Sequence, residues 1–263
     1  MTRHEMDRKT TVIKVGGARL ARGEDLERLA AHVRELLNSG ERTIVVHGGG
    51  PEISELHHRL EVEVEKHEGL RVTRGEGMDL TVMVLCGSVR TRIMEHFAAH
   101  DVPALGLSGA DLGLLRAPLL DADLLGRVGG PPAVDLEQLE RLLALGAVLV
   151  ITPVSLGPDG RLVNVNADDA AHAIATAVGA DSLDFLSNIP GVRDGEDEVI
   201  DQIEPAEVPQ LVDEGVVRGG MVPKLRAAVA AVRAGVTRVR IGNLSTLADD
   251  RATEITVEKG AGS

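Results

Sequence analysis

The sequence has 263 residues, a formal net charge of −13, one cysteine, and no tyrosine or tryptophan. This acidic balance argues against a general binder of nucleic acid or of an anionic membrane surface, and the single cysteine, Cys86, cannot form an internal disulfide. Residues 1–10 are charged and lack the apolar core of a signal peptide, and no apolar run reaches membrane-spanning length. We therefore expect a soluble cytoplasmic protein with an aliphatic core, long enough for one large or two small domains.

Extended and helical apolar patterns alternate from the start of the chain. A strand at 11–16, a helix at 24–38 and a strand at 43–47 form a β-α-β unit, whose right-handed crossover predicts a parallel sheet. Residues 112–130 predict hairpins, and the pattern restarts at Asp181, which indicates a second lobe. Further helices are predicted at 52–60, 78–99, 136–145, 170–178, 205–214 and 220–232, and further strands at 61–65, 104–107, 147–151, 182–187, 236–241 and 253–257.

Two of the predicted strands end in glycines. The strand at 43–47 continues into Gly48-Gly49-Gly50-Pro51 and a helical pattern, and the first strand carries Lys14 and ends in Gly16-Gly17. Glycines let the backbone approach an anion closely, and a following helix offers free N–H groups and the positive end of its dipole. Three glycines after a strand are also typical of a tight turn. The second glycine-ended strand and its lysine favour a site for one phosphate chain.

An unusual polar cluster, Asn164-Val165-Asn166-Ala167-Asp168, precedes an alanine-rich helical pattern. Alternation places Asn164 and Asn166 on one face of an extended segment, with Asp168 at the helix start. The structural interpretation is an aspartate N-cap preceded by two turn asparagines. Capping does not exclude function, because an acid at a helix N-terminus stays ionised and can orient lysines. Lys224, near the glycine-bearing start of another predicted helix, is a second candidate for phosphate contact.

The common phosphate motifs are absent. No Gly-x-x-x-x-Gly-Lys-Ser/Thr sequence occurs, the glycine triplet at 48–50 lacks the later glycine and acid of a dinucleotide site, and no zinc or protein-kinase motif is present. What remains is two lysines, an acid, two asparagines and Arg71. That arginine fits a solvated surface residue or a bidentate carboxylate ligand. Such a set could neutralise a transferring phosphoryl group and hold a small acidic acceptor.

Five motifs, in this order, resemble the amino acid kinase family. They are Lys14-Val15-Gly16-Gly17, His47-Gly48-Gly49-Gly50-Pro51, Gly69-Leu70-Arg71-Val72-Thr73, Asn164-Val165-Asn166-Ala167-Asp168 and Gly220-Met221-Val222-Pro223-Lys224. The resemblance extends from about residue 11 to residue 256, and the third and fourth motifs are particular to members that phosphorylate the γ-carboxylate of N-acetyl-L-glutamate in arginine biosynthesis. It implies an α/β fold, a three-layer αβα sandwich with an open, mostly parallel central sheet. Residues 1–180 would bind the acyl amino acid and dimerise, and residues 181–263 would bind the nucleotide.

The resemblance also implies a role for each site residue. Lys14 and Lys224 would stabilise the charge of the transferring phosphoryl group, and Asp168 would hold the two lysines in position. The glycines of the strand ends would donate backbone N–H groups to the phosphoryl oxygens; these are Gly16, Gly17, Gly49 and Gly50. The acceptor would be held by Arg71, Asn164 and Gly48. No general base is needed because the acceptor carboxylate is ionised at neutral pH.

The implied cofactors are ATP and Mg²⁺, with the ion bridging phosphates and water and no strong protein ligand. We expect a homodimer, insensitive to arginine, with small-molecule substrates and no nucleic acid or membrane partner. Alternatives are a sister kinase for carrier-protein-linked aminoadipate or glutamate, a kinase for N-succinylglutamate, and a non-catalytic ligand sensor with this fold. The net charge of −13 and the glutamates at 61–65 count against an acidic carrier protein, and a sensor would be expected to lose Lys14, Lys224 or Asp168. Asn188 stands where the family usually has aspartate. The residues that hold the nucleotide base are therefore not assigned.

Overall fold

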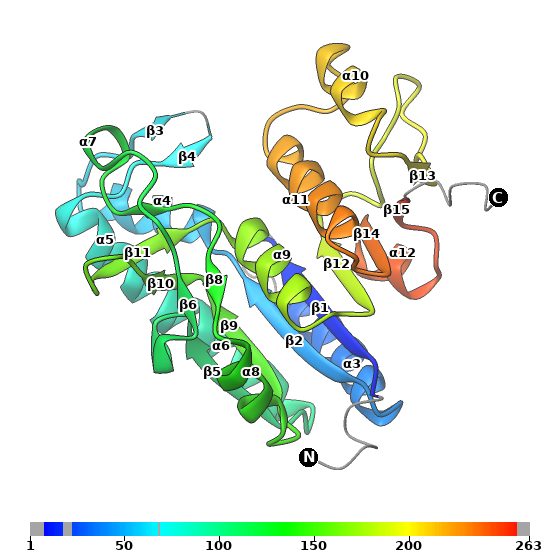
Figure 1. Ribbon diagram of the computed structural model, residues 1–263, viewed down its shortest axis with the longest axis horizontal. Helices are drawn as coiled ribbons and strands as arrows, with labels where there is room; N and C mark the ends of the chain where they lie inside the picture. Colours follow the sequence, from blue (N-terminus) through cyan, green and yellow to red (C-terminus); the bar gives the residue numbers. More distant parts are fainter. Residues whose placement is uncertain (1–7, 18–22, 68, 257–263) are drawn as a thin grey trace.

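A computed structural model describes residues 8–17, 23–67 and 69–256 of the chain. Its centre is an eight-stranded sheet in the order β13-β15-β14-β12-β1-β2-β9-β5, in which only the β14–β15 pair is antiparallel (Figure 1). The strands of this sheet are β1 (Thr10–Val15), β2 (Arg42–His47), β5 (Ala104–Ser108), β9 (Val148–Thr152), β12 (Ser182–Leu186), β13 (Gln202–Ile203), β14 (Arg238–Gly242) and β15 (Thr253–Ile255).

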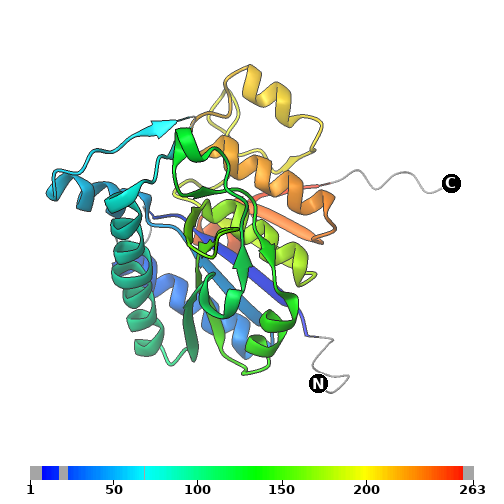
Figure 2. The ribbon, with the colours of Figure 1, turned by 60° about the vertical axis from the view of Figure 1, so that its left-hand side comes forward.

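Helices cover both faces of this sheet (Figure 2). Successive residues of a strand point to opposite faces, so Val12 packs in one apolar cluster with α8, α9 and α11, and Ile13 packs in another with α3, α4 and α6. The α-helices are α3 (Gly23–Asn38), α4 (Gly50–Arg59), α5 (Gly75–Val82), α6 (Arg90–Ala99), α7 (Ala122–Leu125), α8 (Leu136–Leu143), α9 (Ala167–Ala177), α10 (Val208–Asp213), α11 (Met221–Arg233) and α12 (Leu244–Ala248). The predicted three-layer αβα sandwich is confirmed.

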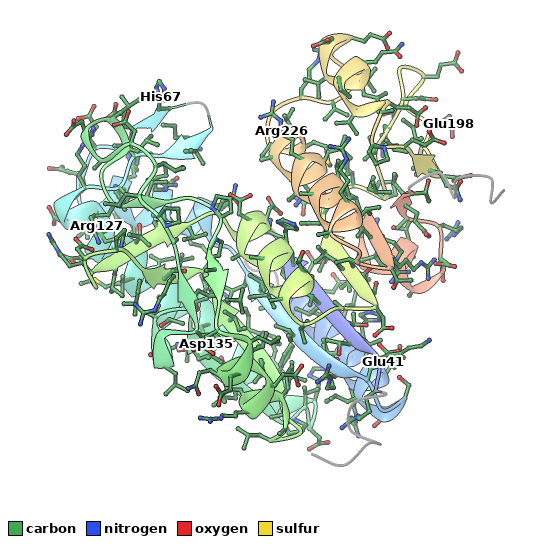
Figure 3. All side chains as sticks on the ribbon, viewed as in Figure 1. Glu41, His67, Arg127, Asp135, Glu198 and Arg226 are labelled. Atoms are coloured by element: carbon green, nitrogen blue, oxygen red, sulfur yellow. The ribbon has the colours of Figure 1, made fainter. Side chains whose placement is uncertain are left out.

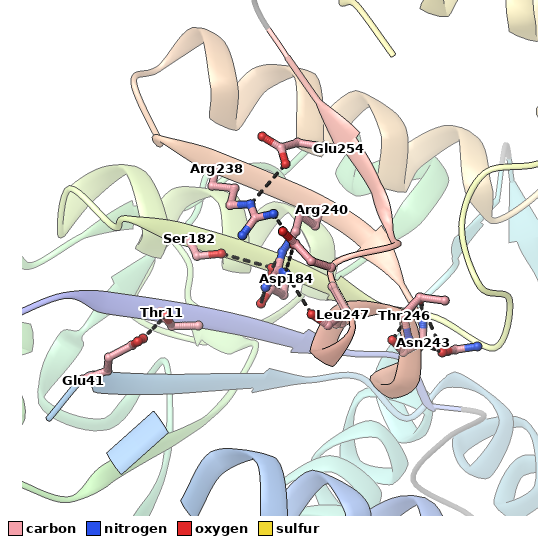
Figure 4. Close-up of polar contacts among 11 residues, drawn as sticks. Thr11, Glu41, Ser182, Asp184, Arg238, Arg240, Asn243, Thr246, Leu247 and Glu254 are labelled. Atoms are coloured by element: carbon pink, nitrogen blue, oxygen red, sulfur yellow. Dashed lines mark hydrogen bonds and ion pairs between the residues drawn. The ribbon is translucent and has the colours of Figure 1, made fainter. Parts of the chain in front are cut away.

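Strands from the two predicted lobes share the large sheet. Strands β1, β2, β5 and β9 come from the chain before residue 180, and the other four come after it. The junction is the parallel pair β1–β12, in which Lys14 lies opposite Phe185. Within the second group, Arg240 of β14 donates two hydrogen bonds of 2.8 Å to the buried carboxylate of Asp184 in β12 and a third to the carbonyl of Leu247 in α12 (Figure 4).

A smaller sheet lies at one end of the large one. Its order is β7-β11-β10-β6-β8. The hairpins predicted between residues 112 and 130 are largely wrong, because β6 and β7 pair with other strands and the short helix α7 lies between them. One isolated antiparallel bridge, between Leu119 and Gly129, is hairpin-like. Arg127, labelled in Figure 3, ties two of its loops together through hydrogen bonds of 2.8 and 2.9 Å to Asp159. Its strands are β6 (Leu115–Arg116), β7 (Val128–Gly129), β8 (Ala133–Val134), β10 (Val154–Leu156) and β11 (Leu162–Val165), with the 3-10 turn η2 (Asp111–Gly113) before β6.

The predicted strand at 61–65 is wrong. Glu61 adopts a positive φ of 57°, and the N–H of Val62 bonds back to the carbonyl of His57, so these residues end helix α4. A two-stranded hairpin follows, made of β3 (Lys66–His67) and β4 (Leu70–Arg71). The alternation of glutamate and valine therefore reflects a solvated connection in which Val64 is 39% exposed.

The predicted long helix at 78–99 is continuous but changes its winding. Between α5 and α6 the chain forms a π-helical segment, η1 (Met83–Val89). A π-turn inserts an extra residue and shifts the phase of the buried face. Met83 is 60% exposed and continues the outer face of α5 that carries Glu76 and Asp79, whereas Val84, Ile93 and Phe97 are buried.

Candidate active site

Two lysines and one aspartate meet at the carboxyl end of the central strands. Lys14 lies in β1, and Asp168 and Lys224 lie in the first turns of α9 and α11. The Nζ atoms of Lys14 and Lys224 lie 2.8 and 3.0 Å from Asp168 Oδ1, and each of the three residues is 7% exposed or less. The three predicted catalytic residues therefore form one buried cluster with two positive charges and one negative charge.

Burial and charge act against each other in this cluster. Burial alone would raise the pKa of Asp168, but the charges of Lys14 and Lys224 outweigh it and lower that pKa below the usual range. Burial and the charge of Lys14 lower the pKa of Lys224 to about 8, although Asp168 opposes the change. The ring of Phe185 lies 5.2 Å from Lys224 Nζ, where an aromatic face attracts a cation. The residual positive charge suits an anionic ligand.

Asp168 is not the cap of its own helix. The N-cap of α9 is Asn166, whose side-chain oxygen accepts a hydrogen bond of 2.8 Å from the N–H of Asp168. The expectation of an aspartate N-cap is thus wrong by two residues. The difference matters because Asn166 satisfies the helix terminus, so the Asp168 carboxylate is left to contact Lys14 and Lys224.

The two glycine-ended strands meet as a pair of tight turns. A Cβ atom on Gly17 would lie 3.0 Å from both Gly49 Cα and Gly50 N, and one on Gly49 would lie 2.5 Å from a methyl carbon of Leu85. A side chain at Gly17 would press on the backbone of the other turn, and one at Gly49 would have to displace Leu85. Helix α4 begins at Gly50 directly after the turn, which places a helix N-terminus beside the cluster, as the phosphate-loop hypothesis predicts.

His47 supports this turn, a role that the sequence did not indicate. Its Nδ1 lies 3.0 Å from the carbonyl oxygen of Gly48, and its Nε2 lies 2.7 Å from Thr152 Oγ1. A carbonyl can only accept, so Nδ1 carries the proton and Nε2 accepts from the Thr152 hydroxyl. Complete burial lowers the pKa of His47 to about 4, and the imidazole is neutral. Only the pairing of β2 with β9 could have revealed Thr152 as its partner.

Arg71 contacts the same turn from the β3–β4 hairpin. Its Nη2 donates to the carbonyl oxygen of Gly50 at 2.9 Å and to Ser54 Oγ at 2.6 Å. Its Nη1 is buried and has no hydrogen-bond partner. Burial lowers the pKa of Arg71 from its ordinary value, but an arginine remains charged at any physiological pH. The half-buried guanidinium therefore keeps N–H groups without a protein acceptor, and a guanidinium can hold a carboxylate bidentately.

Asn164 lies across from Arg71 in β11. Its Nδ2 donates to Thr73 Oγ1 at 3.1 Å, and the Thr73 hydroxyl donates to the carbonyl oxygen of Arg71 at 2.9 Å. Thr73 is fully buried. The two predicted substrate-binding residues are therefore linked through one hydroxyl group, and neither is a freely solvated side chain.

A cavity of about 320 Å³ joins these groups. Most of the predicted site residues line it, namely Lys14, Gly17, Gly48, Gly49, Gly50, Arg71 and Asn164. Three do not: Asp168 and Lys224 lie behind Lys14, and Gly16 faces the carbonyl of Leu186 in β12. The lining also includes residues that the sequence did not single out as ligands, among them Leu85, Val128 and Pro153. The cavity is thus lined by the ammonium group of Lys14 and the glycine turn, and also by the guanidinium-bearing side chain of Arg71.

A family model confirms the resemblance, because the amino acid kinase family matches residues 9–243. The chain belongs to the amino acid kinase family. Membership in a kinase family implies ATP as the phosphoryl donor and a small-molecule substrate. Among the residues that the structure describes, no helix is both long and apolar enough to cross a membrane.

Curated relatives in this family cover nearly the whole chain. The acetylglutamate kinase of Methanopyrus kandleri is 43% identical over 251 residues, which is 92% of this chain and 98% of the relative. That of Chloroflexus aurantiacus is 46% identical over 243 residues, 91% of this chain and 94% of the relative. Among solved structures, smu.665 from Streptococcus mutans has a TM-score of 0.85 and 30% identity, covering 94% of this chain and 98% of that chain.

A solved structure of lower sequence identity agrees in fold. Carbamate kinase from Giardia lamblia bound to AMP-PNP has a TM-score of 0.69 at 16% identity, covering 96% of this chain and all of that chain. Identity at this level supports the fold alone. The central sheet and its helical layers are thus shared with a protein whose sequence has diverged widely.

Proposed function

We propose that the protein is an acetylglutamate kinase, which transfers the γ-phosphoryl group of ATP to the γ-carboxylate of N-acetyl-L-glutamate in the second step of arginine biosynthesis. The observation that carries the proposal is one cavity lined by Lys14, the glycine turn and Arg71, with Lys224 joined to Lys14 through Asp168 Oδ1. Relatives of that name at 43% and 46% identity over nearly the whole chain support the choice of substrate.

The reaction needs positioning and charge neutralisation rather than a base. A γ-carboxylate oxygen of the acceptor attacks the γ-phosphorus, a new P–O bond forms, and the bond to the β-phosphate oxygen breaks with its electrons leaving on ADP. The carboxylate is already ionised, so no proton is removed. Negative charge accumulates on the phosphoryl oxygens and the leaving oxygen during this step, and cations held in a buried site stabilise it strongly.

The cluster at Asp168 supplies that charge stabilisation. Lys14 and Lys224 contact the phosphoryl group and the leaving oxygen, and Asp168 holds both ammonium groups in place through its Oδ1 atom. Backbone N–H groups of Gly17, Gly49 and Gly50, together with Gly16 of the first strand end, donate to phosphoryl oxygens. Burial of the cluster keeps water from screening these charges.

The acceptor lies on the opposite side of the cavity. Arg71 pairs with a carboxylate of acetylglutamate, Asn164 hydrogen-bonds the acceptor through its side-chain amide, and Gly48 contacts it through the backbone. Every residue that lines the cavity precedes residue 168, which supports residues 1–180 as the acceptor lobe. Lys224, from the chain after residue 181, then reaches the reaction centre from a nucleotide lobe formed by residues 181–263.

Mg²⁺ accompanies ATP in this proposal. Within the described part of the chain, no group of three or more His, Cys, Asp or Glu side chains lies close enough to hold a metal ion, and Asp168 is engaged by two ammonium groups. This donor set fits an ion held by phosphate oxygens and water, since Mg²⁺ retains several waters in most sites. The ion supplies charge neutralisation on the phosphates.

The substrate is tested by ADP release in a coupled assay. Acetylglutamate, succinylglutamate, glutamate, aspartate and uridylate are offered in turn with ATP and Mg²⁺, with an acidic carrier protein loaded with aminoadipate or glutamate as a further acceptor. We expect turnover with acetylglutamate. Turnover on another acceptor, with none on acetylglutamate, would remove the proposal, and ADP release on no acceptor would favour a ligand sensor.

We also propose that the protein is a homodimer whose activity is insensitive to arginine. Light scattering measures the assembly, and the same ADP assay with millimolar arginine measures the inhibition. A hexamer that arginine inhibits is the result that contradicts this proposal.

A further inference from the structure

Ser54 closes a triangle of hydrogen bonds around the guanidinium of Arg71. Arg71 Nη2 donates to Ser54 Oγ at 2.6 Å and to the carbonyl oxygen of Gly50 at 2.9 Å, and the Ser54 hydroxyl donates to that same carbonyl at 3.0 Å. Gly50 is the first residue of α4, and Ser54 lies one turn further along the same helix. The triangle therefore joins the β3–β4 hairpin to the glycine turn.

The triangle uses one end of the guanidinium and leaves the other available. Nη2 has two N–H groups, and both find acceptors, whereas Nη1 is buried without a partner. A guanidinium is planar, so fixing Nη2 also fixes the direction in which Nη1 points. Without the hydroxyl, Nη2 would keep a single acceptor, and the guanidinium plane could rotate about that remaining contact.

We propose that Ser54 is a positioning residue for the acceptor: its hydroxyl holds the guanidinium of Arg71 at a fixed orientation relative to the glycine turn. This inference rests on the proposed function, because it assigns the free end of Arg71 to the carboxylate of the acceptor. The same turn carries the N–H groups of Gly49 and Gly50. Ser54 therefore links Arg71, which binds the acceptor, to the N–H groups that bind the phosphoryl group.

A purely structural role for Ser54 predicts different kinetics. Serine often bonds back to the carbonyl four residues earlier in its helix, with no function beyond the helix itself. Loss of such a bond would change the stability of α4 and would affect both substrates alike. Loss of orientation at Arg71 weakens binding of the acceptor alone, since the side-chain hydrogen bonds of Ser54 go to Gly50 and Arg71 and not to the lysine cluster.

The test compares Ser54→Ala with Ser54→Thr, which keeps the hydroxyl. Ser88→Ala, at an exposed serine in η1, is the matched control. Kinetic constants are measured with ATP and with the acceptor that the wild type turns over in the substrate panel, so a wrong acceptor is distinguished from a wrong role for Ser54. We expect Ser54→Ala to raise the KM for the acceptor about tenfold, with kcat and the KM for ATP within about twofold of wild type. Ser54→Thr should stay near wild type.

A double-mutant cycle assigns the effect to Arg71. In an Arg71→Lys background the planar guanidinium is absent, so adding Ser54→Ala should raise the acceptor KM by less than about twofold. The proposal is overturned by a wild-type acceptor KM in Ser54→Ala. It is also overturned by an equal loss for both substrates, or by a tenfold effect that persists undiminished in the Arg71→Lys background.

Discussion

Lys14 and Lys224 come from opposite ends of the chain, yet their Nζ atoms contact the same oxygen atom, Asp168 Oδ1, at 2.8 and 3.0 Å. Two ammonium groups held against the same oxygen atom repel one another, and one carboxylate cannot cancel both charges. The cluster is therefore electrostatically incomplete without an anion. The excess positive charge favours binding of a phosphoryl group. Removal of either lysine should therefore weaken that binding and the stabilisation of the transferring group.

Replacing either lysine should abolish most of the turnover. In Lys14→Met or Lys224→Met, a side chain of similar length remains but the cation that meets the phosphoryl oxygens is lost. We expect kcat to fall about 10²- to 10³-fold, the usual effect of removing one preorganised charge-stabilising group. Arg233→Met removes an exposed cation from the same helix as Lys224 and should retain wild-type rates. ADP release measures all three, and a lysine variant with near-normal kcat would refute the mechanism.

The low pKa of Lys224 predicts a limit at alkaline pH. Because burial and the charge of Lys14 lower this pKa to about 8, the free enzyme loses the proton, and with it the cation, as pH rises through about 8. The value of kcat/KM for ATP reports ionisation in the free enzyme, so it should decline about tenfold for each pH unit above that value. Acceptor ionisation cannot cause this decline because carboxylates are already charged. A profile that stays flat to pH 9.5 is incompatible with this assignment.

The sequence predicted the parts of the fold and site that depend on local pattern. The glycine-ended strands, the helix start at Asp168 and the β-α-β crossover follow from periodicity and from glycine geometry, and the motifs identified Arg71 and Asn164. Contacts between distant segments could not be read in the same way. Thr152 becomes the partner of a histidine in β2 only through the pairing of β2 with β9.

Local pattern also failed where tertiary context prevailed. The glutamates and valines at 61–65 alternate like a strand, but no neighbouring strand pairs with them in the described structure, and they serve as the exit from α4. The π-helical segment at 83–89 could not be predicted either, because its side chains match the pattern of an ordinary helix. Ser54 could not be singled out since a helical serine carries no signal of its own without the fold.

The neutral buried His47 predicts a loss of stability in acid. Burial lowers its pKa in the folded state to about 4, from an unfolded value near 6.5. Between these values the unfolded chain binds a proton that the native state excludes, so the free energy of unfolding falls as pH decreases, by about 3 kcal/mol from pH 7 to pH 4. Urea denaturation at several pH values should show a shallower dependence in His47→Gln. His58→Gln, at an exposed histidine in α4, should keep the wild-type dependence; equal slopes in all three proteins would contradict the assignment.

The glycine turn should not tolerate a methyl group at Gly49. A Cβ there would lie 2.5 Å from Leu85 Cδ2 and 3.2 Å from Val89 Cγ2. Gly49→Ala must therefore displace these side chains of η1 or the glycine turn itself, which should lower the free energy of unfolding by about 1–3 kcal/mol. Displacement of the turn also misplaces its N–H groups, and we expect at least a tenfold loss of kcat.

The clash at Gly49 can be tested by relieving it. In the double variant Gly49→Ala/Leu85→Ala the added methyl group has room, so kcat should recover relative to Gly49→Ala even though Leu85→Ala alone lowers stability. Gly195→Ala is the control, because a Cβ at that glycine meets no atom within 4 Å. Additive losses in the double variant would show that the clash is not the cause.

The ion pair between Asp184 and Arg240 should govern stability rather than catalysis. Both oxygens of Asp184 accept 2.8 Å hydrogen bonds from Arg240, and Asp184 is 1% exposed (Figure 4). Arg240→Ala leaves this carboxylate buried without its partner, and breaking a buried pair from one side costs about 3–5 kcal/mol. Arg251→Ala removes an exposed partner of Asp249 and should cost less than about 1 kcal/mol. Urea unfolding measures both variants.

Replacing the pair together, as Asp184→Leu/Arg240→Met, should recover much of the lost stability because apolar groups need no partner in the interior. Arg240→Ala with wild-type stability would mean that solvent reaches Asp184 in solution.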